Sequence, residues 1–342
     1  MSNLISNNSD FLFIYEAIQC NPNGDPDQEN KPRMDYDTNT NLVTDTRVKR
    51  YIRDYVKQEG NEIFVDMVSE SKVTMDKRLE GILEQLWDNP EQMQLLIDDD
   101  KLTKDYEELK GKDFKATLKK LNDSKDKAVP FAILTGLVKK KFLDIRLFGS
   151  AFAVGGFNKP FTGPVQMNWG YSFNKVYLMD SPTITSIMND GNSTFGKDYR
   201  VKYSLLGFHG TINKAAAVST GMTEHDHETF QKAIWDSLSA NPTRTKLNQY
   251  PKLYLEIIYN DGYSNGQFGD LRGYVKSLPR KIKEGKEERI DEREVRNFGD
   301  LDLDFTELTQ LINEFKVKGG AIKDVVVKSS PDMKKKLTYG NH

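Results

Sequence analysis

Residues 44–57, TDTRVKRYIRDYVK, combine apolar and cationic side chains at helical spacing. The cations are Lys49, Arg53 and Lys57 at positions i, i+4 and i+8, flanked by Arg47 and Arg50. Residues four apart lie on the same side of an α-helix. Such a row of long side chains can follow the phosphates of a nucleic acid while the charged heads stay hydrated. The pattern indicates a phosphate-binding helix, and a solvated helix face without a ligand is the alternative.

The loop at residues 21–35, NPNGDPDQENKPRMD, has acidic residues at alternate positions from Asp25 to Glu29, which suggests a cation-binding loop. A calcium loop of the EF-hand type requires Gly at its sixth position and Glu at its twelfth. This chain has Asn30 and Tyr36 there. The prolines and the glycine of the loop instead favour a rigid cluster of turns.

The few histidines and the single cysteine limit the chemistry further. His225 and His227 lie near a predicted helix N-terminus at i and i+2, so their side chains point to different sides. His209 follows a predicted strand and is a candidate to stack on a base or bind a phosphate; a histidine at a sheet edge is the alternative. Cys20 alone allows neither an intrachain disulfide nor a multi-cysteine zinc site. With no Ser/His/Asp or Walker signature present, we expect no catalytic residue, metal or cofactor.

The composition is that of an ordinary globular protein. The chain has 342 residues, of which 37% are hydrophobic and 29% charged. No apolar run approaches the roughly 20 residues of a membrane span, and no signal peptide is visible at the N-terminus. We therefore expect a cytoplasmic protein without a membrane partner, built as one large domain, 1–342, with insertions.

Charge is unevenly distributed although the formal net charge is only −2. Residues 76–110 carry 5 Lys or Arg against 11 Asp or Glu, whereas residues 111–160 carry 11 against 4. An acidic segment beside basic ones is compatible with a polyanion-binding surface.

The order of predicted elements indicates an α+β fold. A β-branched and aromatic strand comes first, the basic helix follows, and strands, a second helix and a further strand complete a ferredoxin-like order with long insertions. Sheets of this kind often bind single-stranded RNA. The expected elements are strands at 11–18, 62–75, 165–169, 199–208, 252–259 and 321–328, helices at 44–57, 131–148, 223–238 and 303–315, a helical insertion at 76–128, a hairpin at 176–200 and a charged surface insertion at 261–299.

Three segments together resemble one known family. They are NPNGDPD (21–27) with PRMD (32–35) and VTDTRVKRYIRDY (43–55), then DIRLFG (144–149), and then GPVQ (163–166). In these segments the chain is similar to the backbone subunit of the Cascade complex of type I CRISPR systems, within the RAMP superfamily and nearest to subgroups I-B and I-C. The likeness covers about residues 10–260.

The resemblance implies an RRM-like palm with helical fingers at 76–128 and a thumb hairpin at 176–200. Such subunits polymerise along a guide RNA (crRNA), and the thumb folds over the RNA segment of the neighbouring copy. The implied RNA contacts are Arg33, Thr44, Thr46, Lys49, Arg50, Arg53, Phe148, Gly149 and Gln166. An apolar thumb wedge is expected among Met179, Ile184, Ile187 and Met188.

The resemblance also favours one of two functions. Type III relatives cut target RNA with a loop aspartate, and this chain has Asp25, Asp27 and Asp35 in the comparable loop. Type I backbone subunits are not nucleases, and the NPNGDPD form of the loop belongs to them. We therefore expect a crRNA-binding subunit that works with copies of itself and other Cascade subunits and presents the guide to target DNA; an RNA endonuclease is the alternative.

Overall fold

A computed structural model describes residues 3–66, 75–154, 157–180, 183–187, 193–283 and 286–337. The chain divides into two compact units, which are described separately. The helical unit comprises Met1–Ser6, Val56–Val165 and Asn213–Gln231, and the sheet unit comprises Asn7–Tyr55, Gln166–Ile212 and Lys232–His342. Most of the helical unit is thus one segment inserted into the chain of the sheet unit. In the part of the chain that the structure describes, no helix is long and apolar enough to cross a membrane.

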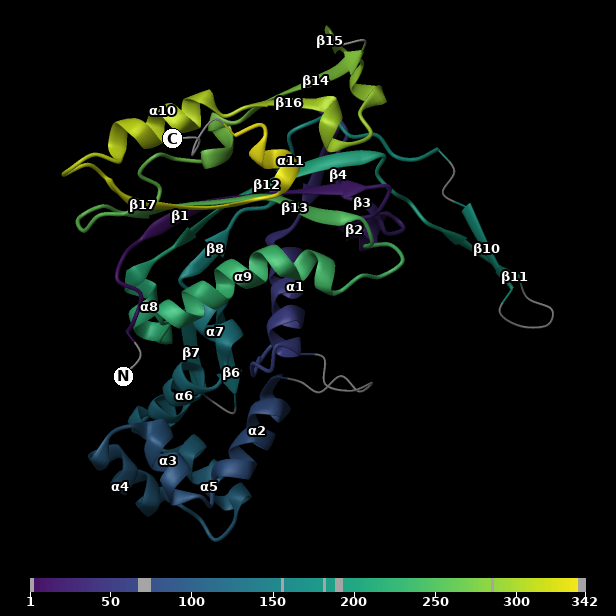
Figure 1. Cartoon of the computed structure of the whole chain (residues 1–342). Coiled ribbons are helices and arrows are strands. Elements are labelled where there is room, and N and C mark those ends of the chain that lie inside the picture. The colour runs from purple at the N-terminus through teal and green to yellow at the C-terminus, as the bar shows by residue number, and fades with distance from the viewer. Residues whose placement is uncertain are drawn as a thin grey trace. The chain divides into compact units, whose positions relative to one another are not determined.

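The sheet unit is built on an eight-stranded sheet in the order β17-β13-β1-β12-β9-β5-β4, with β8 paired to β12 (Figure 1). Neighbouring strands along this path are antiparallel. The bounds are β1 Ser9–Ile18, β4 Met34–Asp35, β5 Thr40–Val43, β8 Val165–Met167, β9 Gly170–Ser172, β12 Tyr203–Ile212, β13 Gln249–Tyr259 and β17 Ile322–Ser329. The strand predicted at 199–208 begins later, because residues 199–202 lead from the hairpin back to the sheet.

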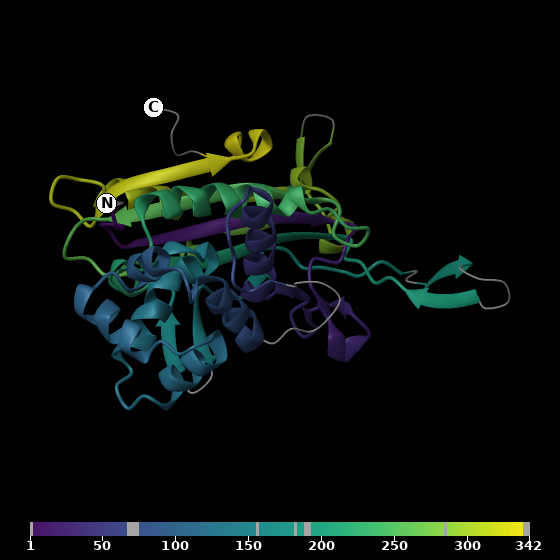
Figure 2. The same ribbon diagram turned by 90° about the horizontal axis from the view of Figure 1, so that it is seen from below.

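Helices α1 (Asp45–Gln58) and α9 (Glu224–Ala240) run across one face of this sheet (Figure 2). Successive side chains of a strand point to opposite faces, so alternate residues of β1 face this layer. Tyr15 stacks on Phe208 with ring centroids 5.9 Å apart, and Phe13 packs against both rings. The helix predicted at 44–57 is confirmed as α1. Its apolar stripe covers this aromatic surface.

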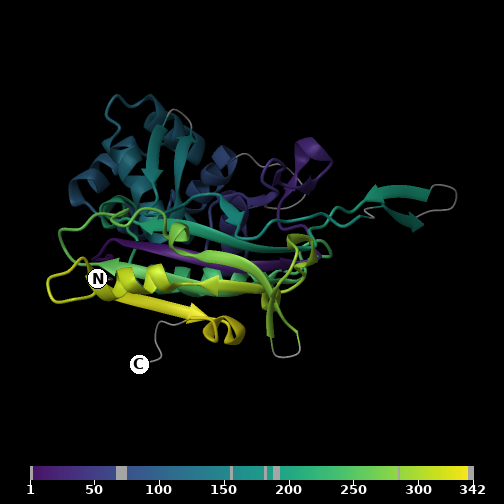
Figure 3. The ribbon, with the colours of Figure 1, turned by 90° about the horizontal axis from the view of Figure 1, so that it is seen from above.

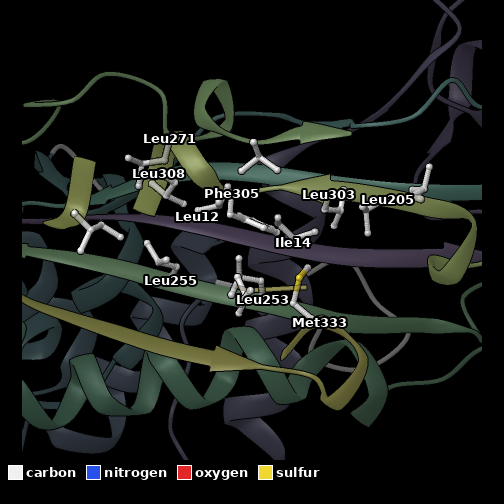
Figure 4. Packing of buried hydrophobic residues seen from close by; sticks show 14 of the residues in the cluster. Leu12, Ile14, Leu205, Leu253, Leu255, Leu271, Leu303, Phe305, Leu308 and Met333 are labelled. Atoms are coloured by element: carbon white, nitrogen blue, oxygen red, sulfur yellow. The ribbon is translucent and has the colours of Figure 1, made fainter. Parts of the chain in front are cut away.

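The opposite face is covered by elements that lie between residues 271 and 334 (Figure 3). The cover consists of η2 Leu271–Tyr274, β14 Lys276–Lys283, β15 Lys286–Arg289, η3 Glu292–Glu294, η4 Phe298–Asp300, β16 Leu301–Asp304, α10 Thr306–Phe315 and α11 Pro331–Lys334. Leu12 and Ile14 of β1 lie in one buried cluster with Leu303, Phe305 and Leu308 (Figure 4). Burying each such side chain stabilises the fold by about 1.5–3 kcal/mol. Bases therefore cannot stack on this sheet face, contrary to what is usual for open sheets that bind RNA.

The segment 261–299, predicted as a charged surface insertion, differs from that expectation. Leu271, Val275, Ile290 and Phe298 are scattered among its charged residues. All four are buried in the same cluster as Leu12 and Ile14. These apolar residues follow no period of 2 or 3.6, so no helical or strand pattern revealed them.

The helical unit contains α2 Met75–Leu86, α3 Pro90–Ile97, α4 Asp100–Leu109, α5 Phe114–Asp123, α6 Ala128–Lys140, α7 Leu143–Phe148 and α8 Lys214–Thr220, with a β6–β7 hairpin (Gly149–Val154 and Phe157–Thr162). Asn89, Asp99 and Asp113 cap α3, α4 and α5 with their side chains, which explains why this polar segment forms several short helices. The helix predicted at 131–148 is interrupted because Phe142 adopts an extended conformation. The strands predicted at 62–75 are absent from the described residues 62–66.

A separate hairpin lies within the region predicted as the thumb. Strands β10 (Thr183–Ile187) and β11 (Ser193–Lys197) pair with each other and form their own two-stranded sheet. At the base of the hairpin, Lys197 forms an ion pair with Glu29 at 2.8 Å, and the Tyr199 hydroxyl donates to the same carboxylate at 3.0 Å. The base of the hairpin is therefore tied to the loop at 21–35.

Candidate nucleic-acid interface

The loop at 21–35 is held against the start of α1 by asparagine side chains. Asn23 Oδ1 accepts hydrogen bonds from the backbone N–H of Thr44 at 2.9 Å and from its hydroxyl at 3.0 Å. Asn21 Nδ2 donates to the carbonyl of Asn30 at 2.7 Å. A Cβ at Gly24 would lie 1.8 Å from Asn30 Oδ1, so a larger residue would displace the Asn30 side chain. The residues of the NPNG motif thus fix a rigid loop at the position where the resemblance expects RNA.

Most cations predicted on α1 have carboxylate partners. Lys49 Nζ lies 3.0 Å from Asp45, and Arg50 Nη2 lies 2.7 Å from Asp54, each at i,i+4 spacing. Lys57 pairs with Asp66 at 2.6 Å. Thr46 is exposed and Arg53 half-buried. The helix therefore presents much less positive charge than a count of its lysines and arginines indicates.

Arg33 lies between a carboxylate and an aromatic ring. Its guanidinium is 3.2 Å from Asp25 and 5.9 Å from the ring centroid of Trp169, which is 50% exposed. Trp169 follows β8, where Gln166 is also exposed. A half-exposed indole beside an arginine offers a stacking surface for a base. Sequence reasoning missed Trp169, and its only signal was an aromatic residue following the GPVQ strand.

The turn that carries Trp169 is fixed by contacts with Arg272 and Phe208. Arg272 Nη1 donates to the carbonyl of Trp169 at 2.7 Å, and its guanidinium stacks on Tyr171 at 4.1 Å. A Cβ at Gly170 would lie 2.3 Å from the ring of Phe208, so the strand can approach that closely only with glycine. The position of the indole is thus determined by the packing of the sheet.

His209 is buried in the sheet unit. Its Nδ1 accepts a hydrogen bond from the N–H of Leu271 at 3.4 Å. Burial lowers the pKa of His209, although the carboxylates of Asp270 and Asp10 act in the opposite direction. The ring is therefore neutral at pH 7 and has a structural partner. An RNA contact of His209 stays a prediction.

The polar residues of DIRLFG are engaged inside the helical unit. Asp144, fully buried, accepts from the N–H groups of Phe64 at 2.7 Å and Val65 at 2.9 Å. Arg146 donates to both carboxylate oxygens of Asp226 at 2.9 and 2.8 Å. Burial alone would raise the pKa of Asp226, but the hydrogen bonds and charge of Arg146 outweigh it and lower that pKa.

Phe148 and Gly149, predicted as RNA contacts, also have packing roles. Phe148 is buried and meets Phe230 edge to face, with ring centroids 6.4 Å apart. Gly149 has φ +75°, and a Cβ there would lie 2.1 Å from the carbonyl oxygen of Phe161. This backbone conformation and this close approach require glycine. Contacts of the two residues with RNA stay predictions.

The predicted wedge residues are only partly described. Met179 lies at the base of the hairpin and is 37% exposed. Ile184 and Ile187 lie on β10, and Met188 lies outside the described residues.

The loop carboxylates are engaged in local hydrogen bonds. Asp25 pairs with Arg33 and accepts from the N–H of Asp27 at 3.2 Å. The hydroxyl of Thr38 donates to Asp35 at 2.7 Å, and this bond lowers the pKa of Asp35. Among the described residues, no group of three or more His, Cys, Asp and Glu side chains is placed to hold a metal ion.

Comparison with known proteins defines the class. The family model of CRISPR-associated protein Cas7 matches residues 7–306. The chain therefore belongs to the Cas7 family, which confirms the resemblance to the Cascade backbone subunit. A curated relative from Haloferax volcanii, CRISPR-associated protein Cas7, is 30% identical over 296 residues, covering 79% of this chain and 75% of that protein.

Two solved structures are also similar. A chain of a CRISPR RNA-guided surveillance complex, pre-nicking, has a TM-score of 0.45 at 13% identity and covers 75% of this chain and 80% of its own. A chain of a CRISPR RNA-guided surveillance complex has a TM-score of 0.38 at 14% identity, with coverage of 76% and 72%.

Proposed function

We propose that this protein is a crRNA-binding backbone subunit that polymerises along the guide in a CRISPR surveillance complex and presents it for pairing with target DNA. The observation that carries the proposal is the match of the Cas7 family model to residues 7–306. The partners are then the crRNA, further copies of this chain and other Cascade subunits.

The strand order of the sheet unit supports an RRM-like palm. Strands β13, β1, β12 and β9 are neighbours in this order, and α1 and α9 cover one face. Apart from insertions, the chain order β1, α1, β9, β12, α9, β13 is similar to the β-α-β-β-α-β order of a ferredoxin-like fold, which supports the proposal. Because the other face is covered, the RNA lies along the loop at 21–35, the start of α1 and the β8–β9 turn.

The β10–β11 hairpin supports the role of a thumb. Its described residues, 183–187 and 193–197, pair with no strand of the large sheet, and Met179 at its base is exposed. A contact made by this element with the next copy is heterologous, and a heterologous contact that does not close produces a helical filament.

Co-expression with a repeat array tests the proposal. We expect a helical ribonucleoprotein with excess absorbance at 260 nm and a regular period of nuclease protection. Deletion of residues 182–196 should leave RNA binding but abolish the period. A monodisperse monomer free of RNA would contradict the function, and an unchanged period after the deletion would place the thumb elsewhere.

The endonuclease alternative is not favoured. Asp25 and Asp35 are occupied by Arg33 and Thr38. Incubation of the assembled complex with matched target RNA and Mg²⁺ should leave that RNA intact. Cleavage at regular intervals that disappears in an Asp25→Ala, Asp27→Ala or Asp35→Ala variant would overturn this assignment.

A further inference from the structure

Two cations near the start of α1 lack the carboxylates that their neighbours have. Arg47 lies in the first turn of α1, with its guanidinium 5.4 Å from the ring centroid of Tyr51. Lys246 lies in the loop before β13, and its Nζ donates to the carbonyl of Asn21 at 2.5 Å. Within the described ranges, no Asp or Glu forms an ion pair with either side chain.

Hydrogen bonds to neighbouring segments fix the position of Lys246. The N–H of Asn21 donates to the carbonyl of Thr245 at 2.9 Å, which joins the loop at 21–35 to the loop before β13. Gln249 Nε2 donates to the carbonyl of Lys246 at 2.9 Å and to the hydroxyl of Tyr51 at 3.1 Å. The backbone of Lys246 is therefore fixed through Gln249, which also bonds α1, and its ammonium is held by the carbonyl of Asn21.

The surrounding loops add positive charge. Arg200 and Arg244 share one carboxylate, that of Asp198, at 2.7 and 2.8 Å. Arg200 Nη1 also donates to the carbonyl of Gln19 at 3.1 Å. Together with Arg47 and Lys246, these arginines bring four cations to the start of α1 and the loops around residues 19–21, and two of the four share the carboxylate of Asp198.

The surroundings of Lys246 disfavour its charged form. Burial lowers the pKa of Lys246 to about 8, and the positive charge of Arg47 acts in the same direction. Cys20 supplies no anion, because burial raises the pKa of its thiol to about 12. Partly buried charges in proteins are normally paired, so an anion from outside the chain would complete this arrangement.

We propose that Arg47 and Lys246 together bind one backbone phosphate of the guide RNA. The inference rests on the proposed function and adds Lys246, which lies outside the segments that resemble the family. The arginine offers a planar fork of donors and the lysine a point charge, and both suit a phosphodiester. Because phosphates carry no sequence information, this contact positions the RNA without reading its bases.

The test is the salt dependence of binding to a labelled single-stranded RNA by protein freed of its native RNA. The variants are Arg47→Gln, Lys246→Met and the double variant. The matched control is Lys323→Met, which removes one exposed cation from β17 of the same unit. We expect each single variant to bind at least about fivefold more weakly than the control. The double variant should lower the log–log salt slope by about 0.7, the value for one phosphate on a single strand, rather than by twice that.

The outcomes separate the inference from the proposed function. If the unmodified protein binds no RNA, the proposed function fails. If it binds RNA and the double variant matches Lys323→Met in affinity and slope, the phosphate site is wrong. Lys246→Arg keeps the charge and should retain most of the affinity. If Lys246→Met loses both thermal stability and RNA binding and Lys246→Arg restores neither, Lys246 has a structural role and the inference is overturned.

Discussion

Arg146 in the helical unit and Arg47 in the sheet unit both lie in segments that resemble the Cas7 family, but their surroundings differ. Arg146 binds the buried carboxylate of Asp226 with two hydrogen bonds. Arg47 lies near Lys246, and among the residues described no carboxylate pairs with either. The first arrangement satisfies its charges internally, and the second leaves positive charge for a ligand. Family-like sequence therefore marks packing residues as well as binding residues.

The largest effect on stability is expected from breaking the buried ion pair between Arg146 and Asp226. Asp226→Asn leaves Arg146 buried without its counter-ion, and loss of one partner of a buried pair costs about 3–5 kcal/mol. Chemical denaturation should show this loss, whereas Asp324→Asn, which breaks the exposed pair with Lys316, should change stability by about 0–1 kcal/mol. Equal effects of the two variants would show that Arg146 and Asp226 do not form the buried pair.

Charge reversal at Lys246 should separate stability from binding. Lys246→Glu turns the repulsion from Arg47 into an attraction but also removes the hydrogen bond to the carbonyl of Asn21, so the melting temperature should change little. RNA affinity should fall at least about tenfold, or about 1.4 kcal/mol, because the phosphate now meets a carboxylate. A melting curve and a titration with labelled RNA measure the two quantities. A fall in both would contradict this separation.

The pH dependence of RNA binding sharpens the same comparison. The pKa of Lys246, about 8, lies below the ordinary lysine value of about 10.4. Below pH 8 the charged lysine opposes folding, and this cost is relieved as pH rises from about 8 toward 10.4. A bound phosphate favours the charged form, so RNA affinity should fall as pH rises above about 8. Lys246→Arg should remove this dependence, and an identical pH profile in that variant would assign the titration to another group.

The smallest effect concerns the paired cations of α1. Asp45→Asn removes the ion pair between Lys49 and Asp45, and an i,i+4 ion pair contributes about 0.2–0.5 kcal/mol. If Lys49 faces the RNA, as the resemblance implies, affinity should rise about twofold, measured by the same titration. Affinity unchanged relative to wild type would show that Lys49 serves only the helix.

Periodicity and turn chemistry were sufficient to predict the main elements. The helix at 44–57 and the strand at 252–259 are confirmed as α1 and within β13, because hydrophobic spacing over ten to fifteen residues is a local property of the chain. The NPNG loop was also readable as a rigid turn cluster. The family itself was identified from three short segments and is confirmed by the match to residues 7–306.

Only the tertiary structure decided which charges and which sheet face are available to a ligand. The covering of this sheet face depends in part on buried apolar residues between 271 and 298 that follow no regular period. Lys49 pairs with Asp45 and Arg50 with Asp54, and these ion pairs depend on side-chain geometry that a count of charges does not reveal. Lys246 lies near Arg47 only because β13 pairs with β1, which brings the loop before β13 to the start of α1, about two hundred residues away in the chain. Local patterns determine elements, whereas the compensation of a charge depends on every segment that folds against it.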